Sequence, residues 1–491
     1  ADFAQAVLDA GLVWIGPIPE TIRLLGDKVA SRRIAAKVGA PMAPGTTEPV
    51  HDPRQVVDFA REHGLPVAIK AVHGGGGRGL KVVRRPEEVE EAFLSATREA
   101  EEAFGNGDCF IERFLDAPRH VEVQVLGDTH GRVVAVGTRD CSLQRRNQKL
   151  IEEAPAPFLP DGTAERLCRA AVDICEEAGY VGAGTVEFLV DPDGTMSFME
   201  VNTRIQVEHG VTEETTGVDL VEAQLAIAEG ASVGDVHPRP NGHAMEFRIN
   251  AEDPSKGFVP FPGTIGSLRV PSGPGIRFDT GIESGSTVSG QFDSLLAKLI
   301  VHAPDRASCI RRARRALAEL SIAGVPTVIP FDRAVPEDDD FAADDHLGVY
   351  TRWIEERFLP RTDAATLRGH VLVRTPDGGR LTRTWIELDG RRMSLALPAS
   401  LATASVTAAP QGDGSGTAPD EDPGAIPAPL TGTLVSWLVE DGAHVDAAQP
   451  VAVLEAMKME TQVKAPATGV LHATTKVGDL VAYGSPLGRV S

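Results

Sequence analysis

Residues 430–491 contain an internal repeat, and this repeat limits the possible fold more than any other feature of the chain. Each half begins with a glycine-led apolar stretch, passes a glycine at a turn and ends with a proline-led apolar stretch. The marker residues are Gly432, Gly442 and Pro450 in the first half, and Gly469, Gly478 and Pro486 in the second. Short strands repeated twice in this order predict an all-β, flattened barrel made of two similar halves.

The two halves are joined by Glu455-Ala-Met-Lys-Met-Glu460, so Lys458 stands between two methionines. Taken alone, Met-Lys-Met is typical of a surface lysine beside two gap-filling side chains. At the centre of a two-fold repeat, the segment instead predicts an exposed turn at which a modifying enzyme can reach the lysine amine. We therefore interpret Lys458 as a site of covalent attachment.

Residues 398–429 are rich in Ala, Pro, Gly, Ser and Thr and lack the apolar side chains of a core. We expect a flexible linker there, and a coil of about 30 residues spans roughly 30 Å on average. Residues 359–397 carry strand-like patches at Val371–Val373 and Trp385–Leu388 and are expected to form a small connecting sheet. The C-terminal module is therefore expected to move relative to the rest.

Residues 1–358 alternate helical and strand patterns, which predicts a mixed α/β body. The chain has 491 residues, too many for one apolar core, so several domains are expected. A helix is predicted at Phe3–Gly11, with a short strand after it at Leu12–Ile15. Further helices are predicted at Glu87–Ala103, Ala164–Ala178 and Arg306–Leu320, and strands at Val121–Leu126, Val133–Val136, Thr185–Val190 and Thr195–Val201.

The formal net charge is -22, which repels nucleic-acid backbones, so no nucleic-acid partner is expected. No apolar run reaches the roughly 18–20 residues of a membrane span. Asp2 and Asp9 lie where a secretory signal needs cations. Five cysteines without a Cys-x-x-Cys pair fit reduced thiols. These features together predict a cytoplasmic protein.

A glycine-rich loop, His73-Gly-Gly-Gly-Gly-Arg-Gly79, offers backbone N–H groups that can close around phosphate oxygens. It is not a P-loop, because no Gly-Lys-Ser/Thr follows it. A mobile hairpin turn would explain the glycines equally well. Lys70 lies just before the loop and favours a phosphate clamp.

The segment Glu200-Val-Asn-Thr-Arg-Ile-Gln-Val-Glu208 alternates polar and apolar residues, which in an extended strand puts every polar side chain on one face. A solvated edge strand would alternate too, but would favour Lys and Thr over Asn and Gln. Glu187 lies across the predicted hairpin. Glu187, Glu200 and Asn202 offer hard oxygens suited to Mg²⁺, and Arg204 offers a planar fork for a small planar anion.

Four cations lie close together between Arg139 and Lys149, with Arg145 and Arg146 between them. In a net-negative chain this concentration favours an anion site. A solvated basic loop is the ordinary alternative.

Together these motifs resemble biotin carboxylase, an ATP-grasp enzyme, fused to a biotinyl carrier domain, as in the alpha subunit of acyl-CoA carboxylases. Ala-Met-Lys-Met within the repeat resembles the biotinyl domain, because the similar lipoyl domain lacks the methionine pair. The resemblance covers residues 1–358 and 425–491. Its ordered matches are Leu25–Lys28, the glycine loop, Glu112–Leu115, Pro118–His120, Asp140–Gln144, Glu152–Pro157, Glu200–Glu208 and Arg248–Asp253.

The resemblance implies a multidomain α/β ATP-grasp body followed by an all-β biotinyl domain. It makes residues 1–26 the remnant of an N-terminal domain, whose Asn-Arg-Gly-Glu motif is absent from this sequence. The other implied segments are an ATP-grasp domain at 27–240 with a lid at about 43–115, a biotin carboxylase C-terminal domain at 241–358, a connecting region at 359–397, a linker at 398–429 and the biotinyl domain at 430–491.

The resemblance also assigns residues. Glu208 would be the base that deprotonates bicarbonate for attack on ATP, giving carboxyphosphate. Arg248 would stabilise the biotin enolate, and Lys149 and Arg204 complete the catalytic set. Bicarbonate would be held by Lys149, Arg204, Gln206 and Val207, Mg²⁺ or Mn²⁺ by Glu187, Glu200 and Asn202, ATP by Lys28, Lys70, Gly74, Gly75, Gly76, Gly77, Glu112, Leu115, His120 and Gln144, and biotin covalently by Lys458.

Two residues depart from the family pattern: Asn147 stands where many members have histidine, and His73 replaces a loop glycine. The resemblance implies two protein partners, biotin protein ligase and a separate carboxyltransferase (beta) subunit that selects an acetyl-, propionyl- or longer acyl-CoA. It also implies an oligomeric complex. Another ATP-grasp ligase that makes an acyl phosphate, or a carrier protein with an inactive ATP-grasp part, are the alternatives.

Overall fold

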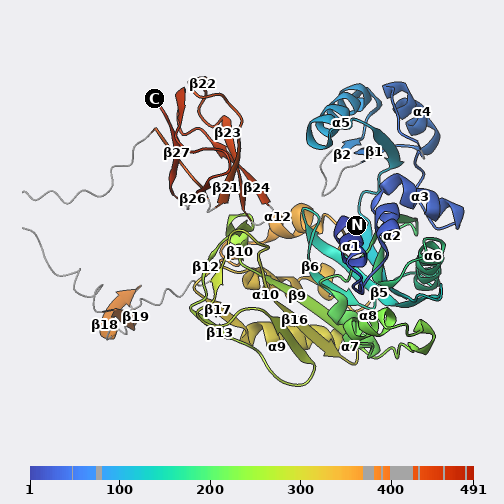
Figure 1. Ribbon diagram of the computed structural model, residues 1–491. Helices are drawn as coiled ribbons and strands as arrows, with labels where there is room; N and C mark the ends of the chain where they lie inside the picture. The colour runs from blue at the N-terminus through green and yellow to red at the C-terminus, as the bar shows by residue number, and fades with distance from the viewer. Residues whose placement is uncertain are drawn as a thin grey trace, which may run out of the picture.

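The structure is a computed structural model, and it describes residues 1–491 except 47, 73–79, 369–380, 389–390, 399–423, 430–431, 457–458 and 482–483. Figure 1 shows a large α/β body and an all-β C-terminal module. Within the described residues, no helix has the length and apolar character needed to cross a membrane.

The body is organised around one eight-stranded sheet, in which every neighbouring pair of strands is antiparallel. We call it the main sheet. The β6–β9 pairing joins residues from the two segments expected at 27–240 and 241–358. In spatial order its strands are β14 (Ile276–Thr280), β16 (Leu295–Ala303), β9 (His243–Asn250), β6 (Gln148–Ala154), β5 (Val133–Arg145), β4 (Arg119–Gly127), β7 (Gly182–Val190) and β8 (Met196–Asn202).

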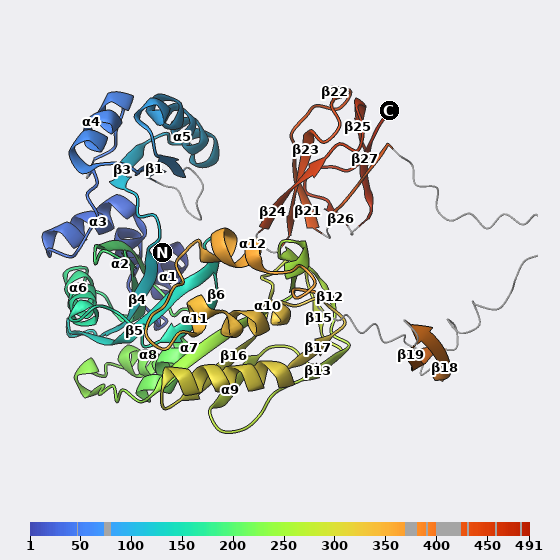
Figure 2. The same ribbon diagram turned by 180° about the vertical axis from the view of Figure 1, so that it is seen from behind.

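Helices cover both faces of the main sheet (Figures 1 and 2). α6 (Thr163–Glu177) and α9 (Arg306–Glu319) bury apolar stripes against one face, where they join the two largest apolar clusters. α7 (His209–Thr216) contacts β5, β6, β9 and β16, and α8 (Leu220–Ala228) contacts β7. The other helices of the body include α1 (Asp2–Asp9), α2 (Pro19–Gly26), α3 (Lys28–Lys37), α10 (Ile329–Ala334), α11 (Asp339–Ala342) and α12 (Leu359–Arg361).

A smaller unit stands apart from the main sheet in both ribbon views and has its own apolar core. We call it the lid subdomain. Its three-stranded antiparallel sheet has the order β2-β1-β3, and β1 pairs with both neighbours. Its elements are α4 (Pro53–His63), β1 (Val67–Ala71), β2 (Leu80–Val83), α5 (Val89–Phe104) and β3 (Cys109–Arg113).

The C-terminal module has two four-stranded sheets around one apolar core, as the repeat predicts. A short strand of the first half, His444–Val445, pairs with the second half, and a short strand of the second half, Leu480–Val481, pairs with the first, so the two halves are interlocked. Val259 of the body packs against this core. The sheets are β20 (Ala425–Pro427), β27 (Pro486–Val490), β25 (Gly469–Ala473) and β22 (His444–Val445), and β24 (Met459–Lys464), β23 (Pro450–Ala456), β21 (Gly432–Trp437) and β26 (Leu480–Val481).

Two sequence expectations are wrong. Leu12–Ile15 form no strand; Leu12 and Val13 are 63 % and 72 % exposed, and no strand of the described part of the chain pairs with them. The linker does not extend to residue 429, because β20 pairs with β27 and thus belongs to the module. The expected connecting sheet includes the pair β18 (Leu381–Leu388) and β19 (Arg391–Pro398). Residues 371–373 and 399–423 lie outside the described residues.

A buried ion-pair cluster ties α9 to the main sheet. Glu153 of β6 contacts His243 of β9 at 2.7 Å and Arg306 of α9 at 2.7 Å and 3.1 Å. Burial raises the pKa of Glu153, but Arg306 and His243 outweigh burial and lower that pKa from its ordinary 4.5 to about 2. The ionised carboxylate therefore stabilises the folded state above its ordinary pKa, and this contribution disappears as pH falls toward 2.

We expect Glu153→Gln to lower the free energy of unfolding at neutral pH by about 3 kcal/mol, because it leaves the buried Arg306 guanidinium without its counter-charge. Urea unfolding of wild type and variant across a pH series measures the difference, which narrows as pH falls below about 4.5. Glu319→Gln, in an exposed ion pair with Arg315 on the same helix, is the matched control and costs under about 1 kcal/mol. A pH-independent difference would contradict this account.

Candidate active site

A cavity of about 470 Å³ lies between the main sheet, α3 and the lid subdomain. Most of the residues predicted for the site line it: Lys28, Lys70, His120, Gln144, Lys149, Glu187, Glu200, Asn202, Arg204, Gln206, Val207, Glu208 and Arg248. Glu112 and Leu115 do not line it, although Glu112 forms ion pairs with Lys70 and Arg32. Gly74, Gly75, Gly76, Gly77 and Lys458 lie outside the described residues.

The alternation of β4 separates the apolar core from the polar site. Val121, Val123 and Val125 join the core cluster under α6. His120 and Glu122 belong to the opposite face, because successive side chains of a strand alternate. Glu122 is fully buried and contacts Arg139 and Lys149. One strand thus supplies both an apolar layer and the polar floor of the site.

Lys149 lies at the centre of a buried ion network. Its Nζ contacts Glu122 at 2.6 Å, Glu187 at 3.0 Å and Glu208 at 2.6 Å. The second oxygen of Glu208 accepts from Arg248 Nη2 at 2.9 Å. Lys149 lies on β6, Arg248 lies on β9, and Glu208 directly precedes α7. Two strands therefore bring a cation each to the Glu208 carboxylate.

The network sets the charge of each member. Burial raises the pKa of Glu208, but Lys149, Arg248 and Arg139 outweigh burial and hold that pKa well below its ordinary value. Burial lowers the pKa of Lys149, and the carboxylates around it hold that pKa well above its ordinary value. Glu208 is therefore a charged carboxylate at neutral pH, although it is 1 % exposed. A charged carboxylate can accept a proton from a bound substrate.

The metal ligands predicted from sequence lie at one end of the cavity. Glu187 and Glu200 are paired across β7 and β8, and Asn202 Nδ2 contacts Glu187 at 2.9 Å. Among the described residues, no hydrogen bond or ion pair engages the carboxylate of Glu200, which also lines the cavity. Carboxylate and amide oxygens suit a hard cation such as Mg²⁺.

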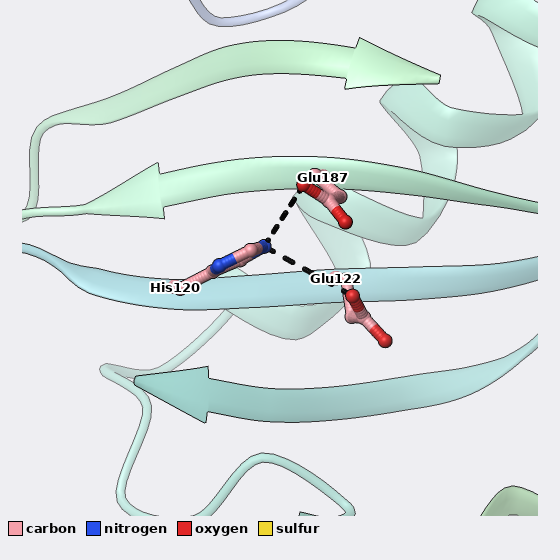
Figure 3. A group of neighbouring side chains, drawn as sticks. All are labelled: His120, Glu122 and Glu187. Atoms are coloured by element: carbon pink, nitrogen blue, oxygen red, sulfur yellow. Dashed lines mark ion pairs between the residues drawn. The ribbon is translucent and has the colours of Figure 1, made fainter. Parts of the chain in front are cut away.

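His120, which was predicted to bind ATP, also lies beside the predicted metal ligands. Figure 3 shows its imidazole between Glu122 and Glu187, with Nε2 at 3.9 Å and 3.2 Å from their carboxylates. Its Nδ1 lies 3.5 Å from Gln144. Burial lowers the pKa of His120, but the carboxylates of Glu187 and Glu122 together outweigh burial, and the net shift of the His120 pKa is upward. His120 can therefore carry positive charge beside the predicted metal ligands.

The alternating strand expected at 200–208 is wrong beyond Asn202, where β8 ends. The chain then turns into α7, so the side chains of 204–208 are not placed by strand alternation. Arg204 is exposed at the rim of the cavity, whereas Gln206 and Glu208 are buried. Gln206 Nε2 donates to Glu187 at 3.0 Å. The polar residues still reach one cavity, but through a turn.

The prediction that the four cations between Arg139 and Lys149 form an anion site is also corrected, because only one of the four lines the cavity. Arg139 is fully buried, bonded to Glu122, and Arg145 stacks over the ring of Phe258. Arg146 turns away toward a separate hollow. Lys149 alone faces the site. Arg139 supports the site from behind by fixing Glu122.

Arg146 and Asn147 form the two-residue turn between β5 and β6, because Arg145 and Gln148 are paired. Both turn residues have positive φ, 48° and 63°. Asparagine tolerates this left-handed conformation better than most residues. Asn147 also lines the cavity. Its departure from the family's histidine therefore suits the backbone of this turn.

Sequence reasoning missed several residues that build the site: Glu122, Cys141, Glu152, Asn250, Ser294 and Lys298. Glu122 could have been found, since it shares the β4 face with His120. Cys141 Sγ lies 4.0 Å from Glu208, and Glu152 contacts Arg248 at 2.5 Å. These contacts are set by strand register, which the sequence does not reveal.

Three family descriptions match the chain. Residues 27–236 match "carbamoyl-phosphate synthase L chain, ATP binding domain", residues 246–356 match "biotin carboxylase C-terminal domain", and residues 424–490 match "biotin-requiring enzyme". The whole chain is 50 % identical to 84 % of the biotin-dependent acyl-coenzyme A carboxylase alpha3 subunit of Mycobacterium leprae. Over 70 % of the chain, it is 47 % identical to 77 % of the biotin carboxylase of Nostoc sp..

Solved structures give the same result. The biotin carboxylase domain of Hydrogenobacter thermophilus 2-oxoglutarate carboxylase, in complex with MgADP, ADP and bicarbonate, matches with a TM-score of 0.67 at 43 % identity, over 72 % of this chain and 78 % of that one. Campylobacter jejuni biotin carboxylase, in a β,γ-ATP complex, matches with a TM-score of 0.68 at 39 % identity, over 72 % and 79 %. The chain therefore belongs to the biotin-dependent carboxylases, as an ATP-grasp biotin carboxylase joined to a biotinyl domain in the manner of an acyl-CoA carboxylase alpha subunit.

Proposed function

We propose that Glu208 is the base of the biotin carboxylase reaction and that it takes a proton from bicarbonate. The observation that carries this proposal is the Lys149–Glu208–Arg248 contact, which keeps a buried carboxylate charged at the edge of the cavity. Loss of that proton leaves an anion that attacks the γ-phosphate of ATP. The product is carboxyphosphate, and ADP leaves.

The cations of the cavity serve the same reaction. Bicarbonate and ATP repel each other, so positive groups must offset their charge where they meet. Lys149 and Arg204 would hold bicarbonate together with Gln206 and Val207, and Lys28 and Lys70 would hold the phosphates. All six residues line the cavity. Arg248 would stabilise the enolate of the biotin ureido group.

The proposed metal and nucleotide sites lie in or beside the same cavity. Glu187, Glu200 and Asn202 would hold Mg²⁺ or Mn²⁺, which when bound supplies positive charge to the ATP phosphates. His120 and Gln144 lie beside that end, where the nucleotide would extend. Glu112 lies on β3 of the lid subdomain, and Leu115 lies in the segment that joins β3 to β4. With Gly74, Gly75, Gly76 and Gly77 they would contact ATP when the lid closes. Closure would exclude water from carboxyphosphate.

Glu208→Gln tests the base. The amide keeps the shape of the side chain but cannot accept a proton, so we expect bicarbonate-dependent ATP hydrolysis, measured with free biotin, to fall about 100-fold or more. Glu283→Gln, an exposed glutamate outside the cavity, is the control and keeps wild-type activity. An active Glu208→Gln protein would contradict the assignment. Wild-type protein without such hydrolysis would favour the inactive carrier protein instead.

Lys458 is proposed as the site where biotin protein ligase attaches biotin. The strands on either side of Met457 and Lys458 are paired, with Ala456 opposite Met459, and the segment joins the two half-repeats. Biotin on Lys458 would receive the carboxyl group at the cavity and carry it away.

Lys458→Ala tests the attachment. We expect streptavidin to bind wild-type protein co-expressed with a biotin ligase and to lose binding to the variant completely, because the other lysines of the repeat, Lys464 and Lys476, do not lie in the Met-Lys-Met segment between the two halves. Lys464→Ala, in the same hairpin, is the control and stays labelled. Full labelling of the Lys458→Ala protein would rule out the site.

We further propose that a separate carboxyltransferase subunit receives the carboxyl group and transfers it to an acetyl- or propionyl-type acyl-CoA. This proposal rests on the likeness to the Mycobacterium leprae alpha3 subunit over the whole chain. We expect mass spectrometry of proteins captured with the biotinylated chain to identify a carboxyltransferase in stoichiometric amount. Carboxylation of acetyl-CoA and propionyl-CoA by the captured complex then compares the two acceptors. Capture of a pyruvate-carboxylating partner would contradict it.

A further inference from the structure

Two consecutive backbone carbonyls beside the proposed base are hydrogen-bonded from outside the cavity. The Gln206 carbonyl accepts from His209, from its ring Nδ1 at 2.7 Å and its backbone N–H at 3.3 Å. The Val207 carbonyl accepts from Lys298 Nζ at 2.9 Å. Neither His209 nor Lys298 lines the cavity, whereas Gln206, Val207 and Glu208 all do. Both peptide groups are therefore oriented by side chains behind the site.

The orientation of these carbonyls fixes the N–H groups that follow them. A trans peptide places its C=O and N–H on opposite sides. The N–H of Val207 therefore points away from His209, and the N–H of Glu208 points away from Lys298. Among the residues that the structure describes, neither N–H donates a hydrogen bond to another residue. Two neighbouring free N–H groups at a turn are an anion-binding arrangement.

Lys298 is held in a fixed place on the main sheet. On β16 it is the cross-strand partner of Arg248 on one side and of Asp279 on the other. Its Nζ lies 3.6 Å from the Asp279 carboxylate, and its side chain is only 12 % exposed. Arg277 holds Asp279 in turn at 2.9 Å. The ammonium that contacts Val207 is thus positioned by strand register.

His209 is the second support, and its protonation is defined by its partner. The Gln206 carbonyl can only accept, so Nδ1 of His209 carries a proton. Burial lowers the pKa of His209, and Lys298 lowers it further. The ring is therefore neutral at neutral pH, with the proton on Nδ1. It acts as a hydrogen-bond donor to the turn and not as a charge.

We propose that Lys298 and His209 are positioning residues, which turn the Val207 and Glu208 N–H groups toward the cavity so that these bind the bicarbonate oxygens. The inference rests on the proposed function, because it takes bicarbonate as the anion. Preorganised N–H donors stabilise an anion more than mobile ones do, since they need no reorientation on binding. Losing one support should therefore weaken bicarbonate binding and leave ATP binding unchanged.

The test uses the full-length protein with Lys298→Met, which keeps the length of the side chain and removes the donor. We expect the KM for bicarbonate in ATP hydrolysis to rise about tenfold, as loss of an ordered charged hydrogen bond predicts. The KM for ATP should stay within about twofold of wild type. Lys298→Arg keeps a cationic donor and should restore most of the affinity. Lys256→Met, which makes the same change at an exposed lysine that does not line the cavity, is the matched control with a near-normal KM.

A bicarbonate-dependent rise in melting temperature with MgADP present gives a second readout that needs no turnover. We expect Lys298→Met to need about tenfold more bicarbonate for the same rise. An unchanged bicarbonate requirement in folded Lys298→Met protein would overturn the inference, as would an equal rise in both KM values. If bicarbonate raises the melting temperature of wild-type protein but the protein does not hydrolyse ATP, the proposed function is wrong. The melting-temperature comparison between wild type and Lys298→Met still tests the inference in that case.

Discussion

Lys149 contacts three carboxylates in the interior of the body, and the rest of the site depends on this one ammonium. A buried charge is costly unless it is paired, and breaking such a pair costs several kcal/mol. Removing Lys149 would leave Glu122, Glu187 and Glu208 close together without their shared cation. The proposed base, the proposed metal end and the floor of the cavity are therefore one electrostatic unit.

The continuous main sheet makes this unit possible. Lys149 lies on β6 and Arg248 on the adjacent β9, although about a hundred residues separate them. Because β6 and β9 are hydrogen-bonded neighbours, the segments matched by two separate family descriptions share one rigid layer. Groups that must approach a single bicarbonate within hydrogen-bond distance gain from such a layer, since strands fix side chains better than loops do.

Sequence reasoning predicted what local pattern encodes. The repeat predicted the two-sheet module, and the Asp191–Gly194 turn predicted the β7–β8 hairpin that brings Glu187 opposite Glu200. Prediction from sequence failed where contacts between distant segments decide the structure. Leu12–Ile15 have strand-like composition, but no strand in the described part of the chain lies beside them. Arg139 forms an ion pair with Glu122, a buried glutamate on another strand, and so does not face the cavity. Most site residues were predicted from the family resemblance, because composition and periodicity do not reveal strand register or turn geometry.

Two glutamates contact the same guanidinium, but their pKa values are shifted in opposite directions. Arg248 bonds Glu208 at 2.9 Å and Glu152 at 2.5 Å. Burial raises the pKa of Glu152 to about 7, with Glu208 adding to the rise against the opposing effect of Arg248. Glu208 differs because it also contacts Lys149, which together with Arg248 and Arg139 outweighs the effect of burial on its pKa. Carboxylates whose environments separate their pKa values take different roles. The lysine thus selects which glutamate stays charged, and it is the one that faces the proposed bicarbonate site.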